Sequence, residues 1–476
     1  IDAGMLDIAG EVNMGTRGEI VQSSGKPLAV ERYAFEQLTL NSRGDLRMSN
    51  NAALYQPGNA TLAAAQIYPA TGDSGMVTVG QSSRVDEFGN IRVTLDPLRM
   101  LNIERSAGSA TPNQPFSVFG SLNLIAPTIK QHGVLRAPLG QITLGAEGYE
   151  AYTGHVKLLP GSLTSVSAKG LTMPYGGTLD GLSYLYDGND VVFKGVGNGP
   201  EIALTGAAID MQQGAVLDMS GGGTLTGAAF LAGRGGSTDA RLNPLVQMKP
   251  NGGFTLPGLN TNPVYAIIPG VQPDVAPLTA EQGAGKPAVG RQITIAAGVP
   301  GLAAGTYTLL PSNFALLPGA FRVELNGLAG AVETGGTIAM RNGSFATAAQ
   351  TGVAGTAIRD VVAQQAILTP ADVLRSYSQY NETGYAAFAV AQATRDGVPR
   401  AALERDAHGV RVQLIAPSVH SVKDNHTPLM MDGSALYAPA EGGFGGSLLL
   451  GTGNHASTRY EVLADGTAPL ADFNGV

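Results

Sequence analysis

The chain has 476 residues, of which 43% are apolar and 14% are charged, and its formal net charge is −8. This apolar share argues against intrinsic disorder, and the lack of Lys/Arg-rich runs argues against nucleic acid as a partner, because phosphate binding requires a basic surface. Cysteine is absent, so disulfides and thiolate metal sites are excluded. No apolar run reaches the length of about 18 residues that spans a bilayer, so we expect no membrane span.

Residues 1–235 are expected to form a shaft of very short, stacked strands. Apolar and polar residues alternate over a few positions, and Gly, Pro, Asn and Ser then turn the chain, which is typical of strands and too dense for helices. The clearest apolar runs are Leu122/Leu124, Ile142/Leu144 and Val156/Leu158. The 66 glycines, about twice the usual share of roughly 7%, supply the positive φ angles that tight corners require.

An internal repeat favours stacked coils. Segments 122–140 and 202–221 share one pattern of apolar residues and corners, and a weaker echo begins at Ile293. The matched pairs are Leu122 with Ile202, Leu124 with Leu204, Ile129 with Ile209 and, after one inserted residue, Gly133 with Gly214, Leu135 with Val216 and Gly140 with Gly221. A circuit of about 20 residues is typical of a solenoid, in which each coil pairs with its neighbours. Roughly 15–20 coils at about 4.8 Å each would make a rod on the order of 70–100 Å long.

Two segments interrupt the shaft. Residues 236–290 are rich in Pro, Gly and Asn and are expected to form an ordered excursion, after which the shaft continues over 291–357. Residues 358–405 are expected to be a helical insertion, and the shaft then resumes over 406–476.

The helical insertion shows the strongest helix signal in the chain. Thr369 is expected to be the N-cap, followed by Pro370 at the first helical position and Asp372 in the first turn. Residues 385–396 resemble a second helix. Beyond the insertion, strand patterns return at 410–419 and 446–451.

Several consecutive blocks between residues 53 and 330 resemble the large exoproteins of the filamentous haemagglutinin family, which two-partner systems secrete from Gram-negative bacteria. The blocks that carry the resemblance are ATLAAAQIYPATG, LNLIAPTIKQHGVLRAPLGQITLGA, GHVKLLPGSLTSVSAKGLTMPYGGTLDG, NPVYAIIPGVQPDVAP and AGTYTLLPSNFALLPGAFRVEL. The resemblance implies an all-β, right-handed parallel β-helix (a β-solenoid), interrupted here by the excursion and the insertion. It also implies a shaft segment without a recognisable secretion domain or toxin domain.

The same resemblance implies a function, a location and a partner. The chain would be a structural or adhesive segment of a secreted surface exoprotein, a stiff extracellular rod or filament used in adhesion or biofilm building. It would reach the outer cell surface through an outer-membrane barrel transporter. The stalk of a contact-dependent toxin delivery protein is one alternative. Because uncapped coil ends are open strand edges, we also expect the chain to continue into more coils or to stack end-to-end into filaments. The ligand on a host or neighbouring cell is not identified.

Two sets of residues are candidates for interaction. Arg43, Gly44 and Asp45 form an RGD tripeptide, which occurs as an integrin ligand in some adhesins. The flanking strand patterns favour a tight Gly turn instead. Tyr265 in the excursion and Tyr377 and Tyr380 in the insertion could present aromatic surface to a partner, although an excursion that only covers the rod is the simpler interpretation.

A carbohydrate-active β-helix enzyme is a further alternative, because such enzymes need paired carboxylates on one strand face. The candidates Asp180, Asp187 and Asp190 lie in DGLSYLYDGND, where Asp-Gly and Asn-Asp favour turns. The six histidines show no metal-ligand spacing; they are His132, His155, His408, His420, His426 and His455. We therefore expect a chain that is not an enzyme and has no catalytic, cofactor-binding or metal-binding residues.

Overall fold

The computed structural model is 46% strand and 6% helix, which confirms the all-β prediction. It describes residues 1–21, 27–32, 34–85, 88, 90–109, 112–148, 151–193, 199–233, 238–244, 247–248, 254–255, 262–271, 275–281, 285–330, 335–415 and 429–452. The chain divides into two compact units. The first unit comprises Ile1–Lys169, Gly197–Gly222 and Glu404–Val476, and the second comprises Gly170–Val196 and Gly223–Leu403.

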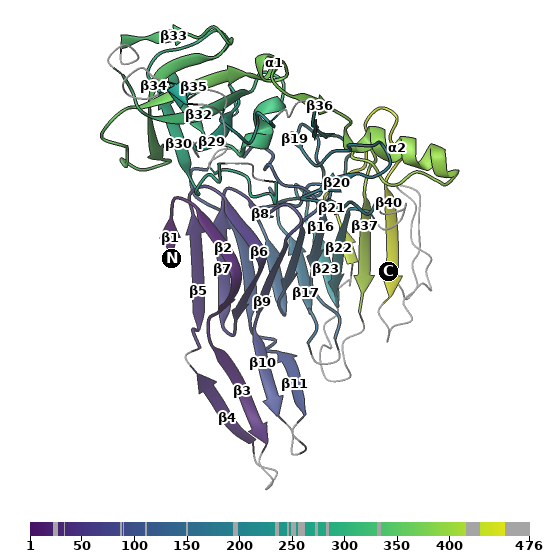
Figure 1. Ribbon diagram of the computed structural model, residues 1–476. Helices are drawn as coiled ribbons and strands as arrows, with labels where there is room; N and C mark the ends of the chain where they lie inside the picture. Colours follow the sequence, from purple (N-terminus) through teal and green to yellow (C-terminus); the bar gives the residue numbers. More distant parts are fainter. Residues whose placement is uncertain are drawn as a thin grey trace. The chain divides into compact units, whose positions relative to one another are not determined.

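The first unit contains an eight-stranded parallel sheet whose spatial order follows the chain (Figure 1). Its strands are β1 (Asp2–Ala3), β5 (Gln37–Ser42), β7 (Asn59–Ala64), β12 (Met100–Arg105), β14 (Thr128–Gln131), β17 (His155–Leu158), β23 (Ala208–Met211) and β38 (Leu429–Met431). Eight strands at about 4.8 Å span only about 34 Å. The expected rod length is therefore too long for this unit, because residues 223–403 contribute no described strand to this sheet.

A second parallel sheet in this unit has two limbs joined by the long strand β6 (Leu46–Gln56). Asn50 and Asn51 both have positive φ angles and bend β6, so its first half pairs with β8 and its second half pairs with β9. One limb continues through β8 (Ile67–Pro69), β15 (Val134–Arg136), β18 (Leu163–Ser165), β24 (Val216–Asp218) and β39 (Ser434–Leu436). The other continues through β9 (Ser74–Val79), β13 (Ser121–Ile125), β16 (Gln141–Leu144), β22 (Glu201–Gly206), β37 (Gly409–Leu414) and β40 (Ser447–Thr452), and β2 (Leu6–Asn13) pairs with β6.

The strand register aligns buried side chains in columns. Ile142 pairs with Leu122 on one side and with Ile202 on the other, so the two ends of the 80-residue repeat lie two strands apart in one column. A second column is Leu38, Ala60, Leu101, Ile129, Val156, Ile209 and Leu429. The predicted match of Leu122 with Ile202 is confirmed, and so is that of Ile129 with Ile209.

The later part of the repeat alignment is wrong by one residue. Val134, not Leu135, aligns with Val216 through Leu163, so the pairing of Gly133 with Gly214 also fails. The cause is a longer corner after β23, where the Ala215 N–H donates to the Gln212 carbonyl and two residues rather than one are inserted.

A four-stranded arm belongs to the first unit and projects past the ends of β5 and β9 (Figure 1). Its strands are β3 (Thr16–Val21), β4 (Pro27–Arg32), β10 (Gln81–Val85) and β11 (Ile91–Leu95), in the order β11-β10-β3-β4. The two hairpins are antiparallel, and β10 joins them by pairing parallel with β3. The arm falls within the predicted shaft at 1–235 but is not part of its stacked sheets.

The second unit is built on an antiparallel sheet, not on further parallel coils. Its order is β29 (Val264–Ile267), β32 (Phe321–Leu328), β35 (Gln364–Pro370), β34 (Phe345–Val353), β30 (Arg291–Ile295) and β31 (Gly305–Thr308), with β33 (Thr337–Ala339) beside β34. Leu310, just after β31, pairs with Ala266 of β29, so the two ends of the sheet meet. The predicted shaft over 291–357 and the echo at Ile293 are therefore wrong, because period-two alternation does not distinguish parallel from antiparallel strands.

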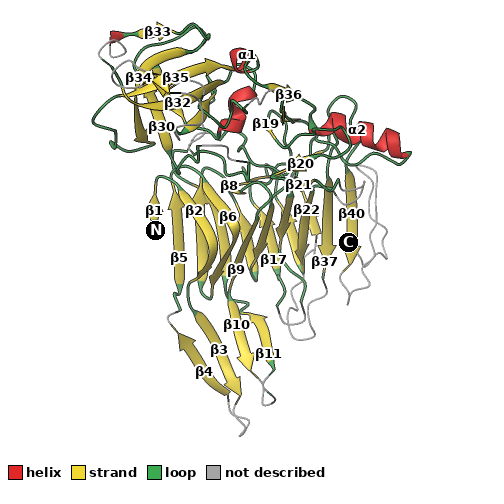
Figure 2. Cartoon of the chain, in the orientation of Figure 1, coloured by secondary structure: helices red, strands yellow, loops and turns green. Residues whose placement is uncertain are grey.

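Helices are short and few among the described residues (Figure 2). The helix expected at 385–396 is confirmed as α2 (Tyr385–Asp396), which ends at Gly397 with φ 65°. The other predicted helix is only the single turn α1 (Ala371–Leu374), and its N-cap is Pro370. Thr369 is not the N-cap because it lies in β35, where its hydroxyl bonds that of Ser344 at 2.9 Å.

The remaining elements are a 3-10 helix and several very short strands. They are η1 (Ser312–Leu316), β19 (Thr172–Pro174), β20 (Leu185–Tyr186), β21 (Asn189–Asp190), β25 (Thr224–Thr226), β26 (Ala229–Leu231), β27 (Gln247–Met248), β28 (Phe254–Thr255) and β36 (Gln379–Asn381). The strand predicted at 446–451 is confirmed as β40, and the one predicted at 410–419 is confirmed as β37 over its first five residues; residues 416–419 lie outside the described residues. Of the shaft predicted over 406–476, residues 416–428 and 453–476 lie outside the described residues.

Candidate functional site

The RGD tripeptide forms the corner between β5 and β6, as the turn interpretation predicts. Asp45 is only 7% exposed, and its Oδ2 accepts a hydrogen bond from Gln66 Nε2 at 3.2 Å. The Asp45 carbonyl accepts a second one from Ser42 Oγ at 2.8 Å. Gly44 is also buried, whereas Arg43 is exposed. Because an RGD ligand must present its carboxylate to the receptor, this corner is a structural turn.

The acidic segment around residue 180 is likewise made of turns. Asp180 Oδ1 accepts hydrogen bonds from the Leu182 and Ser183 N–H groups at 2.8 and 3.0 Å, and these bonds lower the pKa of its carboxyl. Asp187 has a φ of 51° in the turn between β20 and β21, and Asp190 lies in β21. In the part of the chain that the structure describes, no group of three or more His, Asp or Glu side chains could hold a metal ion.

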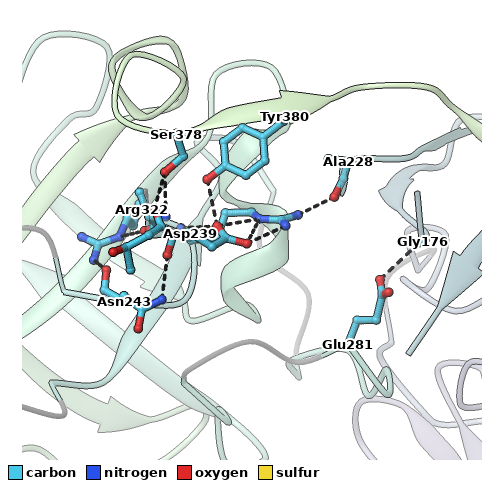
Figure 3. Close-up of polar contacts among 11 residues, drawn as sticks. Gly176, Ala228, Asp239, Asn243, Glu281, Arg322, Ser378 and Tyr380 are labelled. Atoms are coloured by element: carbon cyan, nitrogen blue, oxygen red, sulfur yellow. Dashed lines mark hydrogen bonds and ion pairs between the residues drawn. The ribbon is translucent and has the colours of Figure 1, made fainter. Parts of the chain in front are cut away.

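Glu281, which lies about a hundred residues later in the sequence, accepts hydrogen bonds from backbone N–H groups of the same segment. Figure 3 shows its contact with Gly176. Its two carboxylate oxygens accept from the Gly176 N–H at 3.2 Å and from the Asp187 N–H at 3.0 Å. Burial raises the pKa of this carboxyl, and the two hydrogen bonds oppose the shift. The rings of Tyr175 and Tyr186 stack with their centroids 4.4 Å apart. Glu281 therefore binds the backbone at the residues that follow these two tyrosines, Gly176 and Asp187.

The three candidate tyrosines have different surroundings. Tyr265 is half-buried in β29 of the antiparallel sheet. The Tyr377 hydroxyl donates to the Asn342 carbonyl. The Tyr380 hydroxyl, on β36, donates to Asp239 Oδ1 at 2.9 Å, and burial raises the pKa of Tyr380 to about 12. Of these three tyrosines, Tyr380 belongs to a group of buried polar contacts in the second unit.

We call this set of contacts the Asp239 cluster; it comprises Asp239, Arg241, Arg322, Glu324, Ser378 and Tyr380. Figure 3 shows Asp239, Arg322, Ser378 and Tyr380 together. The Arg241 guanidinium forms an ion pair with Asp239 at 2.8 Å and lies 4.7 Å from the centre of the Tyr380 ring. It also donates to the Ala228 carbonyl at 2.8 Å. Ser378 Oγ accepts from the Ala240 N–H at 2.9 Å. These contacts fix residues 238–243 against β36.

Arg322 attaches the same segment to the antiparallel sheet. Its side chain is fully buried on β32 and donates to the carbonyls of Ala240 at 2.6 Å and Asn243 at 2.7 Å. Its ion pair with Glu324 measures 3.0 Å, and burial lowers the pKa of the guanidinium. Asn262 Nδ2 donates to the other Glu324 oxygen at 3.0 Å. The charged side chains of the cluster bind backbone carbonyls or oppositely charged partners within the second unit, so we call it a polar clamp.

The local sequence around Arg322 and Glu324 predicts a solvated strand face instead of a buried clamp. Phe321, Val323 and Leu325 face the core of the sheet, while Arg322 and Glu324 alternate with them on the other face. Charged residues at alternate positions of a strand normally indicate a solvated face. Here both are buried because the excursion covers them. The described residues of the excursion thus pack on the antiparallel sheet of their own unit, and β29 is a strand of that sheet. The expectation that 236–290 covers the rod is not what these contacts show.

Histidines do not form a site in the described part of the chain. His408 is 4% exposed in the first unit, and burial lowers its pKa to about 4 although Asp406 and Asp218 lie near it. The closest predicted pair, His420 and His426, and also His455, lie outside the described residues.

No family model, curated protein or solved structure matches the chain. The resemblance to the filamentous haemagglutinin family therefore depends on the sequence blocks alone. None of the helices described is long and apolar enough to cross a membrane.

Proposed function

We propose that the chain is a structural and adhesive segment of a secreted, filamentous haemagglutinin-like surface exoprotein. In this proposal the first unit is a right-handed parallel β-helix that serves as a stiff rod. The observation that carries it is the register, in which seven successive parallel strands place one apolar residue each in a single column from Leu38 to Leu429. Such columns bury a continuous core and pair each backbone with its neighbours, which is the way a solenoid gains stiffness.

The excursions support a non-enzymatic role. Of the aspartates that could have served a glycoside-cleaving site, Asp180 and Asp187 lie in turns and Asp190 lies in β21. The buried charges of the second unit bind segments of that same unit. In this proposal, the exposed faces of the stacked strands offer surface for binding. We therefore propose that binding, not catalysis, is the task of the chain.

Export is part of the same proposal. The chain would leave the cell through an outer-membrane barrel transporter of the two-partner type and act on the outer surface of a Gram-negative bacterium. The sequence blocks quoted above are its support. Antibody labelling of intact cells tests it: the chain should be detected outside cells that carry the transporter and remain inside cells that lack it. Equal labelling in both would overturn this part.

Single-molecule pulling tests the rod. Because the chain has no cysteine, thiols introduced at Asp2 and Ser447 are unique attachment points on the first unit. We expect Ile142→Asp, which places a charge in the buried column, to lower the unfolding force, and Thr143→Asp, on the opposite face of the same strand, to leave it unchanged. Equal forces for the two variants would contradict a load-carrying column.

Adhesion is tested with coated beads. Beads carrying the folded chain should attach to host cells or to biofilm matrix more strongly than beads carrying the heat-unfolded chain. Equal attachment of the two preparations would remove the adhesive part of the proposal and leave the rod.

A further inference from the structure

Among the described strands, β11 is an edge strand of the arm. It pairs antiparallel with β10 over Ile91–Leu95, and among the described strands it ends the four-stranded arm. Edge strands present backbone N–H and C=O groups that can pair with another strand, and proteins usually protect such edges with proline, charge or a covering loop. The opposite edge, β4, begins with Pro27. β11 contains no proline and no acidic residue.

Its apolar side chains are unusually exposed. Ile91 is 70% exposed and Val93 is 43% exposed, and both point to the same face because they are two residues apart in a strand. Phe88, in the turn before β11, is 81% exposed. Two exposed apolar side chains on one face of an edge strand favour contact with a partner strand. Ile91 and Val93 thus lie on the edge strand itself, and Phe88 lies three residues before it.

We propose that β11 of one copy pairs antiparallel with β11 of a second copy, with Val93 opposite Val93. This interface joins two chains side by side through their arms, and it does not depend on the proposed function. A closed two-fold pair of this type uses the same surface on both partners.

The strand is self-complementary in this register. Centring on Val93 places Ile91 opposite Leu95 and Arg92 opposite Thr94. No like charges face one another, whereas like charges directly opposite across strands are destabilising. The chain as a whole carries a net charge of −8, which disfavours most contacts between copies, but this strand has only the positive charge of Arg92. The β11 strands of two copies are therefore complementary to each other.

Analytical ultracentrifugation of the full chain over a concentration series tests the proposal. We expect a reversible monomer–dimer equilibrium, and we expect Val93→Lys to weaken it at least tenfold because two ammonium groups would face each other at the two-fold axis. The matched control is Leu98→Lys, since Leu98 is an exposed aliphatic residue (82%) in the turn after β11. The control should dimerise like the wild type. A wild-type chain that stays monomeric at all concentrations, or a Val93→Lys variant that dimerises normally, would overturn the proposal.

A single-cysteine variant fixes the register. The wild type has no cysteine, so Val93→Cys introduces the only thiol. Directly opposite residues of an antiparallel pair have Cβ atoms about 4.5–5.5 Å apart, within reach of a disulfide after small adjustment. Under mild oxidation Val93→Cys should form covalent dimers, and Leu98→Cys should form at least tenfold fewer. Equal yields would show that the dimer uses another surface, such as pairing of β11 with β4, and would overturn the Val93-centred register.

Discussion

Arg322 and Glu324, two residues apart on β32, form a 3.0 Å ion pair in which both side chains are 0% exposed. Replacing one partner leaves the other charge buried and unpaired, which typically costs about 3–5 kcal/mol. We therefore expect Arg322→Met to lower the free energy of unfolding of the second unit by that amount, because it also frees the carbonyls of Ala240 and Asn243. Urea unfolding followed by tyrosine fluorescence measures the change.

Two further variants separate the buried pair from charge in general. Arg395→Met removes a partner from the exposed pair with Asp396 and should change stability by less than about 1 kcal/mol. The double variant Arg322→Met/Glu324→Leu removes both buried charges and should lose less stability than Arg322→Met alone. If the double variant loses as much stability as Arg322→Met and Glu324→Leu lose in sum, the two side chains do not act as a pair.

Ile142 provides a stability test of the column in the first unit. Ile142→Ala should destabilise by about 2–5 kcal/mol, because the residue is fully buried between Leu122 and Ile202 and truncation leaves a cavity. Thr143→Ala, one position along the same strand, should change stability by less than about 0.5 kcal/mol. Thermal unfolding by circular dichroism measures both, and a similar shift for the two variants would contradict the inward-outward assignment.

The first unit should lose stability as the pH falls, because of His408. Its pKa is about 4 in the folded chain against an ordinary value of 6.5, so the unfolded chain binds the proton more readily. Stability is therefore complete above pH 6.5 and declines as the pH falls toward 4, by on the order of 3 kcal/mol over the whole window. Burial causes the shift, and the nearby carboxylates of Asp406 and Asp218 oppose it.

Urea midpoints at pH 7.0 and 4.5 check this expectation. The wild type should lose more stability between these values than His408→Gln, which has no imidazole to protonate. His132→Gln is the matched control, since His132 is exposed on the same unit, and it should behave like the wild type. An unchanged pH slope in His408→Gln would refute the assignment to this residue.

The sequence predicted well where a local pattern had one structural solution. Leu122 and Ile202 were matched from their spacing alone, and their common column follows because parallel strands repeat in register. The alternation at Ile293 predicts a parallel coil but belongs to an antiparallel strand, because the same two-residue period occurs in both. Contacts with residues far away in the sequence decide which strands pair. Whether consecutive strands stack as coils or fold back depends on those contacts and not on the local period.

The polar clamp shows a second limit of the sequence. Tyr380 was selected as an aromatic residue that could contact a partner, but its hydroxyl is bound to Asp239, which lies 141 residues earlier. Nothing in the local sequence of either residue encodes that distance. Arg322 and Glu324 look like a solvated strand face until residues 238–243 and Asn262 are placed over them. Burial of a charged side chain depends on residues far away in the sequence, so the local sequence does not predict it.

The arm depends on Gly18, which pairs with Ser83 where β3 meets β10. A Cβ at this position would lie 2.3 Å from the Ser83 carbonyl oxygen, so Gly18→Ala should force the two hairpins apart. Hydrogen exchange of the β10 and β11 amides should accelerate at least tenfold, which corresponds to about 1.4 kcal/mol. Gly4→Ala is the control, because its Cβ would meet only an Arg43 nitrogen at 3.8 Å. Because β11 belongs to the proposed interface between copies, Gly18→Ala should also weaken dimerisation. The amides of the parallel sheets should keep their protection from exchange. Unchanged exchange of the β10 amides in Gly18→Ala would show that the two hairpins do not stabilise each other.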